Sequence, residues 1–243
     1  MGQIDMRTSV GQLVVEQPGR SRLFERLGID YCCAGKLPLD RACSRAGFDV
    51  AEVLAQLATH DEAGDDEPNL ANLSMCELAD HIEETHHIYL RRELPRLSQM
   101  IDKVVEAHAS TYLWLIDVQE VFVELVAELE MHMMKEERIL FPMIRELEGA
   151  QSLPSFHCGS IGNPIAAMEH EHDNAGDALA KLRQLSGDFT PPENACNTFR
   201  VLLAGLAELE IDLHKHIHKE NNILFVHASQ IESRLQASGG VHS

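Results

Sequence analysis

The strongest constraint on the fold of this chain is a decapeptide that occurs twice, 84 positions apart, as HMMKEERILF (132–141) and HIHKENNILF (216–225). Six of the ten positions are identical, and in both copies Lys and Glu follow the first His after three and four residues. An internal repeat that retains chemically specialised residues indicates that both copies have the same physical role.

Both copies lie on the apolar face of a predicted helix. Because each residue of an α-helix turns about 100°, positions along a segment can be compared by phase. His132 and Glu136 share a face with the apolar residues of the preceding turns, and so do His216 and Glu220. These apolar residues are Val118, Phe122, Leu125 and Leu129 in the first copy and Leu202, Leu206, Leu209 and Leu213 in the second. The repeat therefore covers a helix face that is directed into a core.

Each His-x-x-x-Glu pair places an imidazole and a carboxylate one helical turn apart on the same side of the helix. An ionised glutamate in an apolar core is costly unless it is paired or binds a cation. A buried His–Glu hydrogen bond in each helix is the alternative, but two pairs in phase favour a metal ion. The repeated Lys135 and Lys219 are explained by neither ligation nor packing.

Two further helical segments are expected to supply the remaining ligands. In IAAMEHEHDNAGDALAKL, His172 has the phase of the apolar residues, whereas His170 points away from them. In DHIEETHHIYLRRELPRL, His86 and His87 lie on either side of the leucine stripe, so phase does not choose between them, and the spacing slightly favours His87. With that choice still open, the predicted ligands are His87, His132, Glu136, His172, His216 and Glu220.

Other histidines are not expected at the metal. His108 follows His87 by 21 residues. On a continuous helix this is about 31 Å, which is too far for a shared site. His214 and His218 form an i, i+4 pair that could bind zinc, but they project away from the apolar stripe and are expected to be solvated.

The rest of the sequence predicts an all-α fold. Segments 73–107, 111–148, 162–186 and 193–236 lack strand-like alternation and predict an up-and-down four-helix bundle. Ser74 and Glu77 form a plausible capping box, and Pro95 should kink the first helix or mark a break near residue 94. The first residues contain only short helical pieces. We predict a small helical N-terminal domain at 1–60, an acidic linker at 61–70 and the bundle at 71–243.

Composition excludes several classes of partner. The net charge of −19, from 39 acidic and 20 basic residues, disfavours binding to nucleic acid or to anionic membranes. There is no apolar run long enough to span a membrane and no apolar N-terminal signal segment, which predicts a cytoplasmic protein. The six cysteines are scattered and are expected to be reduced.

Four histidines and two glutamates are too many ligands for one tetrahedral zinc ion, and they include no thiolate. Two octahedral ions bridged by both carboxylates fit better and leave open positions for small molecules. Iron is the first expectation and manganese the second, since His/Glu ligation alone does not separate them.

The order His, His-x-x-x-Glu, His, His-x-x-x-Glu resembles the hemerythrin-like bundle. The motifs HMMKEERILFPMI, MEHEHDNAG and HIHKENNILF are similar to those of the repair of iron centres family, and DYCCAGK (30–36) resembles the Cys-pair signature of its N-terminal domain. The resemblance selects His87 over His86. The chain departs from the pattern at Ala34, where the family usually has Gly, and in ILFVHA, where the first copy reads ILFPMI.

The resemblance implies a cytoplasmic, dimeric protein with two iron ions per chain, bridged by oxide or hydroxide, that restores iron–sulfur clusters damaged by nitric oxide or oxidants. Damaged iron–sulfur proteins are then its partners, and nitric oxide or oxygen its small ligands, with iron donation or nitric oxide reduction as possible chemistry. Cys32 and Cys33 are the candidate catalytic residues. They are either two structural thiols or a pair in which one thiolate handles iron, sulfur or nitrosyl groups.

Two other readings use the same bundle. One is a hemerythrin-like protein that binds or senses oxygen or nitric oxide without repair activity. The other is a metallohydrolase or oxidase, which would need general acid–base groups beside the ions.

Overall fold

The computed structural model describes residues 4–63 and 70–239, and within these residues every regular element is a helix. Residues 64–69, which make up most of the predicted linker, lie outside the described residues. The chain divides into two compact units. The first unit is Met1–Ala79, Ile144–Ile161 and His214–Ser243, and the second unit is Asp80–Met143 and Gly162–Leu213.

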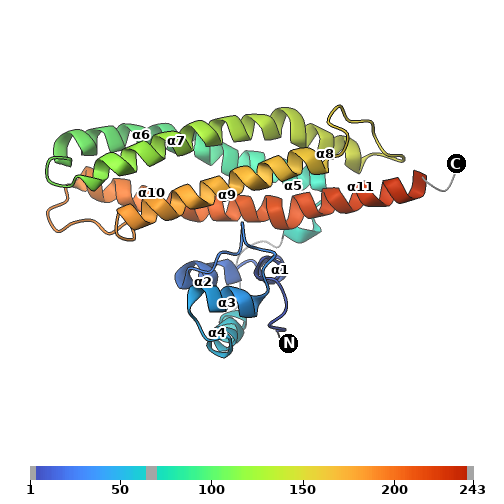
Figure 1. Cartoon of the computed structure of the whole chain (residues 1–243), viewed down its shortest axis with the longest axis horizontal. Helices are drawn as coiled ribbons and strands as arrows, with labels where there is room; N and C mark the ends of the chain where they lie inside the picture. The colour runs from blue at the N-terminus through green and yellow to red at the C-terminus, as the bar shows by residue number, and fades with distance from the viewer. Residues whose placement is uncertain (1–3, 64–69, 240–243) are drawn as a thin grey trace. The chain divides into compact units, whose positions relative to one another are not determined.

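Four long helical segments follow one another from residue 75 onward. They are α5 (Met75–Ile82), η2 (Glu83–His87) and α6 (Ile88–His108); α7 (Trp114–Lys135), η3 (Glu136–Leu140) and α8 (Phe141–Glu148); α9 (Gly162–Leu185); and α10 (Asn197–Lys219), η4 (Glu220–Leu224) and α11 (Phe225–Gly239). In Figure 1, α6, α7, α9 and α10 run alongside one another. The predicted all-α, four-helix bundle is confirmed.

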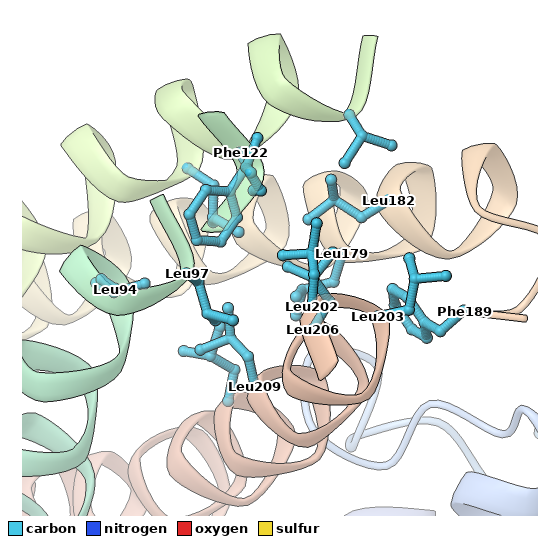
Figure 2. Close-up of a cluster of buried hydrophobic side chains, with 14 of the residues drawn as sticks. Leu94, Leu97, Phe122, Leu179, Leu182, Phe189, Leu202, Leu203, Leu206 and Leu209 are labelled. Atoms are coloured by element: carbon cyan, nitrogen blue, oxygen red, sulfur yellow. The ribbon is translucent and has the colours of Figure 1, made fainter. Parts of the chain in front are cut away.

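The second unit is held together by a leucine-rich core between α6, α7, α9 and α10. Figure 2 shows Phe122 of α7 beside leucines of the other helices, and Phe189 from the loop after α9 closes one end. The apolar residues that precede each decapeptide are all buried in this core, as their helical phase predicted. Burial of each leucine side chain contributes about 2 kcal/mol, which fixes the faces that carry the polar residues.

In the first unit, the N-terminal residues form short helices, also as predicted. These are α1 (Val10–Glu16), α2 (Arg20–Leu27), α3 (Leu39–Ala46) and α4 (Val50–Ala63), followed by the single turn η1 (Leu70–Asn72). Ser9 caps α1, and Gly28 ends α2 in the left-handed conformation that glycine adopts without strain. Their core also includes Ile217 of α10, so these helices pack against the last long segment at this residue.

Carboxylates cap the starts of two long segments in the first unit. The predicted capping box is present, because Ser74 N donates to Glu77 Oε2 and Glu77 N donates to Ser74 Oγ. Glu148 also accepts from the backbone N–H groups of Met75 and Cys76 at the start of α5. In the same way, Glu232 of α11 accepts from the N–H group of Ile161 at the start of α9.

Pro95 lies inside α6, which continues from Ile88 to His108, so the alternative of a break near residue 94 is wrong. A proline inside a helix costs about 3 kcal/mol. The buried neighbours Leu94 and Leu97 offset this cost by packing in the bundle core. No helix among the described residues is long and apolar enough to cross a membrane.

Candidate metal centre

Three of the predicted ligands lie at the ends of π-helical turns. His87 is the last residue of η2, Glu136 is the first residue of η3 and Glu220 is the first residue of η4. A π-helical turn inserts an extra residue into an α-helix and is often found at functional sites. Uniform α-helical phase did not predict these turns.

In the second unit, four predicted ligands are brought together. His87, His132, Glu136 and His172 are all buried. The Nε2 atoms of His87 and His132 lie 3.3 and 3.4 Å from the same carboxylate oxygen, Oε2 of Glu136. The Nε2 atom of His172 lies 3.1 Å from that of His132. The reactive edges of three imidazoles and one carboxylate therefore converge.

A carboxylate outside this cluster orients His87. Glu137 Oε1 lies 2.7 Å from His87 Nδ1 and is also held by Arg91, whose Nη2 atom donates to it at 2.6 Å. Burial raises the pKa of the Glu137 carboxyl, but the hydrogen bonds from Arg91 and His87 outweigh it and hold the pKa below its usual range. Glu137 therefore stays ionised and fixes the proton of His87 on Nδ1.

Glu171 orients His132 in the same way. Its Oε2 atom lies 3.0 Å from His132 Nδ1, and its Oε1 atom accepts from Lys135. The hydrogen bond from His132 lowers the pKa of Glu171, and the hydrogen bond from Lys135 lowers it further. Burial raises the pKa but is outweighed, so the pKa falls to about 2. Lys135 thus has a role that sequence reasoning missed. The available signal was the glutamate directly before His172 in MEHEHDNAG.

The donor set fits a metal ion. With the proton of His87 and His132 on Nδ1, each Nε2 atom carries a lone pair that faces a carboxylate oxygen, and such acceptors repel one another unless a cation lies between them. Two ligands about 2.1 Å from an octahedral ion are roughly 3 Å apart. The observed separations of 3.1, 3.3 and 3.4 Å are close to this value.

In the first unit, the second copy of the repeat brings the other two predicted ligands together. His216 Nε2 lies 2.9 Å from Glu220 Oε1, and both side chains are buried. Both Glu136 and Glu220 have an exposed fraction of 0%. All six predicted ligands belong to buried groups of His and Glu side chains that could hold a metal ion.

The other histidines differ partly from expectation. His170 is exposed, as predicted. His86 is buried beside His87, but its Nδ1 atom faces Asp212 Oδ1 at 2.9 Å. The prediction that His218 is solvated is wrong, because its Nδ1 atom lies 3.4 Å from the carbonyl oxygen of Tyr31 and its ring packs against the Tyr31 ring. Burial lowers the pKa of His218 to about 4, with the Tyr31 carbonyl opposing and Lys219 adding to the shift.

The partly buried His214 also packs its ring edge-on against Tyr31. His214 and His218 are therefore less exposed than predicted, because the N-terminal helices cover this face of the last long segment within the first unit. Helical phase identified the face correctly but not the chain segment that packs on it.

The two candidate catalytic cysteines lie in the loop between α2 and α3. Cys32 is buried and Cys33 is half-buried, and both are thiols, as expected. The hydrogen bond between the Cys32 and Cys33 sulfur atoms, together with burial and the nearby Asp30 carboxylate, raises the pKa of the Cys32 thiol well above its usual range.

Comparison with known proteins covers both regions. The family described as hemerythrin HHE cation binding domain matches residues 78–228, and a family described as a domain of unknown function, DUF542, matches residues 6–61. The curated iron-sulfur cluster repair protein YtfE of Edwardsiella ictaluri is 39% identical over 219 residues, which cover 90% of this chain and 95% of the relative. The proteins of the same name from Dickeya chrysanthemi and Escherichia coli are 38% and 37% identical, over 90% of this chain and 96% and 95% of their own lengths.

Proposed function

Because this chain belongs to the hemerythrin HHE cation binding family and to the family of the YtfE iron–sulfur cluster repair proteins, we propose that it is a di-iron protein that restores damaged iron–sulfur clusters. The damage in question is nitrosative or oxidative. Damaged iron–sulfur proteins are then its clients. We also predict that the protein is a cytoplasmic homodimer. Its predicted domains are 1–60, 61–70 and 71–243.

The proposed ligands are the six residues named from the sequence, with Glu136 and Glu220 bridging two ions. One observation carries this proposal. Two groups of ligand-type side chains each have one ligand atom per residue within 4.8 Å of the others. The first group is His87, Glu136, His216 and Glu220, and the second group is His132, Glu136, His172 and Glu220. The groups share both glutamates. Two ions with two common carboxylates would use all six residues, which supports iron over zinc.

Two iron ions in this centre would supply redox chemistry, an open position for nitric oxide or oxygen, and exchangeable iron for a damaged cluster. The residues of the chain have separate tasks. Glu137 and Glu171 keep the Nδ1 protons of His87 and His132 in place, so that both Nε2 atoms stay available as ligands. All six proposed ligands are buried, which keeps bulk water away from the centre.

Metal analysis and the optical spectrum of the purified full chain test the ligand proposal. We expect two iron ions per chain with absorption typical of a bridged iron pair. One zinc ion per chain would contradict both the ligand set and the function. Glu220→Leu should reduce the metal content, and full iron occupancy in that variant would refute the bridging role.

Repair itself is tested with a client protein whose iron–sulfur cluster has been damaged by nitric oxide. The chain loaded with isotopically labelled iron should restore the cluster and the activity of the client, whereas the metal-free chain should not. Labelled iron in the restored cluster identifies iron donation, and unlabelled iron identifies removal of nitric oxide. Reversible binding of oxygen or nitric oxide without recovery of the client would instead support a sensor.

A further inference from the structure

The loop that carries the two cysteines is organised by one carboxylate. Asp30 Oδ1 accepts from the backbone N–H groups of Cys32 at 2.9 Å and Cys33 at 3.0 Å, and Asp30 Oδ2 accepts from that of Ala34 at 3.1 Å. Both cysteines are therefore fixed around the Asp30 side chain, with the carboxylate on the same side as the Cys32 thiol, whose Sγ atom is 3.3 Å from Oδ1.

The second copy of the decapeptide holds the same loop from its other side. Asn222 of η4 donates through Nδ2 to the carbonyl oxygen of Cys32 at 3.1 Å. Gly11 and Gly35 leave space for this side chain, because a Cβ atom on either would lie 2.3 Å from Asn222 Oδ1. The two cysteines are thus presented by a backbone that is fixed from both sides.

The three side chains have the separations of ligands on one small ion. The Sγ atoms of Cys32 and Cys33 are 3.8 Å apart, and one ligand atom from each of Asp30, Cys32 and Cys33 lies within 4.8 Å of the others. A tetrahedral ion with sulfur ligands at about 2.3 Å separates the two sulfur atoms by about 3.8 Å and a sulfur from a carboxylate oxygen by about 3.5 Å. The observed distances of 3.8 and 3.3 Å are close to both values.

We propose that Asp30, Cys32 and Cys33 bind one thiophilic divalent cation, such as Fe²⁺ or Zn²⁺, at a site separate from the ions of the bundle. Asp30 is exposed and Cys33 is half-buried, so the ion enters from solvent. Three protein ligands leave a fourth position for water. Such a site can accept an ion and release it again.

Binding is a proton exchange without oxidation or reduction. Two thiols give up their protons as two metal–sulfur bonds form, so one bound cation releases two protons. The affinity therefore rises with pH.

A titration of the full chain with Cd²⁺, after the bundle has been loaded with its own metal, tests the site. Cadmium bound to thiolates absorbs in the ultraviolet, so the band reports sulfur ligation directly. We expect one Cd²⁺ per chain, the release of two protons, and no loss of iron. Cys33→Ser should abolish the band, whereas Cys158→Ser and Cys196→Ser, which replace exposed cysteines outside the site, should keep it. Asp30→Asn should weaken binding by more than about 10-fold, because a direct carboxylate ligand is lost and the loss of an outer partner alone already has this cost.

A second measurement uses the unmodified chain and does not depend on how a variant folds. Bound Zn²⁺ should protect Cys33 from alkylation while leaving Cys158 and Cys196 reactive. The proposal fails if the cadmium band persists in Cys33→Ser, if it disappears in the Cys158 or Cys196 variant, or if Cd²⁺ uptake equals the iron displaced. None of these outcomes affects the iron content of the untreated chain, which tests the bundle separately.

Discussion

The two copies of the repeated decapeptide share one face and differ on the other. In both, the histidine and glutamate are buried and the glutamate begins a π-helical turn. On the outer side of the first copy, Lys135 holds the Glu171 that orients the buried histidine. On the outer side of the second copy, His218 and Asn222 instead contact the carbonyl oxygen of Tyr31 in the N-terminal loop. The proposed metal ligation accounts for the shared face, and the local neighbours account for the differences on the other face.

The similarity between the copies continues beyond the decapeptides. Glu148 and Glu232 are also 84 positions apart, and each accepts an N–H group at the start of a long helical segment, α5 for Glu148 and α9 for Glu232. Each copy therefore supplies a His–Glu pair and, further along, a carboxylate that caps a segment with one proposed ligand, His87 after α5 and His172 in α9. The repeated unit is an architectural one and extends past the ligands.

The largest effect is expected where the copies are the same. Glu136→Gln and Glu220→Gln should each remove most of the bound iron, because each proposed bridging carboxylate belongs to both groups of ligands. Iron analysis and the optical spectrum measure the loss, with the exposed Glu130→Gln as a control. If one variant keeps full iron while the other loses it, the two copies are not equivalent and only one glutamate bridges.

The next largest effect is expected at Glu171, which contacts His132 and Lys135 of the first copy. Glu171→Ala should weaken iron binding roughly 10–100-fold, since loss of a carboxylate that orients a ligand histidine typically has this cost. Competition with a chelator measures the affinity. Asp173→Asn, an exposed change beside His172, should leave it unchanged. Equal affinity in both variants would show that Glu171 does not position His132.

Much of this arrangement could be predicted from the sequence. Apolar periodicity gave the four long segments to within a few residues, and it placed His132, Glu136, His216 and Glu220 on the inward face, where the structure has them buried. This prediction worked because burial of an apolar face dominates the energetics of a helix in a bundle.

The remaining features depend on tertiary structure. Phase could not separate His86 from His87 because both are buried, and because the π-helical turn η2 alters the phase where they lie. The burial of His218 could not be predicted, since the chain that covers it is nearly 190 residues away in sequence, at Tyr31. The role of Lys135 required knowledge of which helix lies opposite it. Periodicity within one helix contains none of this information.

A smaller effect is expected where the copies diverge most. Asn222 in the second copy occupies the position of Arg138 in the first, which is exposed. Asn222→Ala should lower the free energy of unfolding by about 1–2 kcal/mol, because a carbonyl of the cysteine loop loses its donor. The matched change Arg138→Ala should have an effect below about 0.5 kcal/mol. Urea denaturation measures both, and alkylation of Cys33 should be faster only in the Asn222 variant.

The smallest effect concerns the capping carboxylates. Burial raises the pKa of Glu148, but hydrogen bonds from Cys76 and from the backbone N–H groups at the start of α5 outweigh it, so the pKa lies below the usual 4.5. A carboxyl whose pKa is lowered by folding makes its full contribution to stability at pH values above its pKa in the unfolded chain. This contribution is lost as the pH falls through the lower, folded value.

Glu148→Gln should therefore lower the free energy of unfolding by about 1 kcal/mol at neutral pH, and by less as the solution is acidified below pH 4.5. Glu146→Gln, an exposed change in the same helix, is the control. Glu232→Gln should cost at least as much at neutral pH, because Glu232 is buried and accepts from a buried N–H group. If only one of the two capping variants is destabilised in denaturation experiments, the similarity between the copies does not extend past the ligands, and the repeated unit ends with the decapeptide.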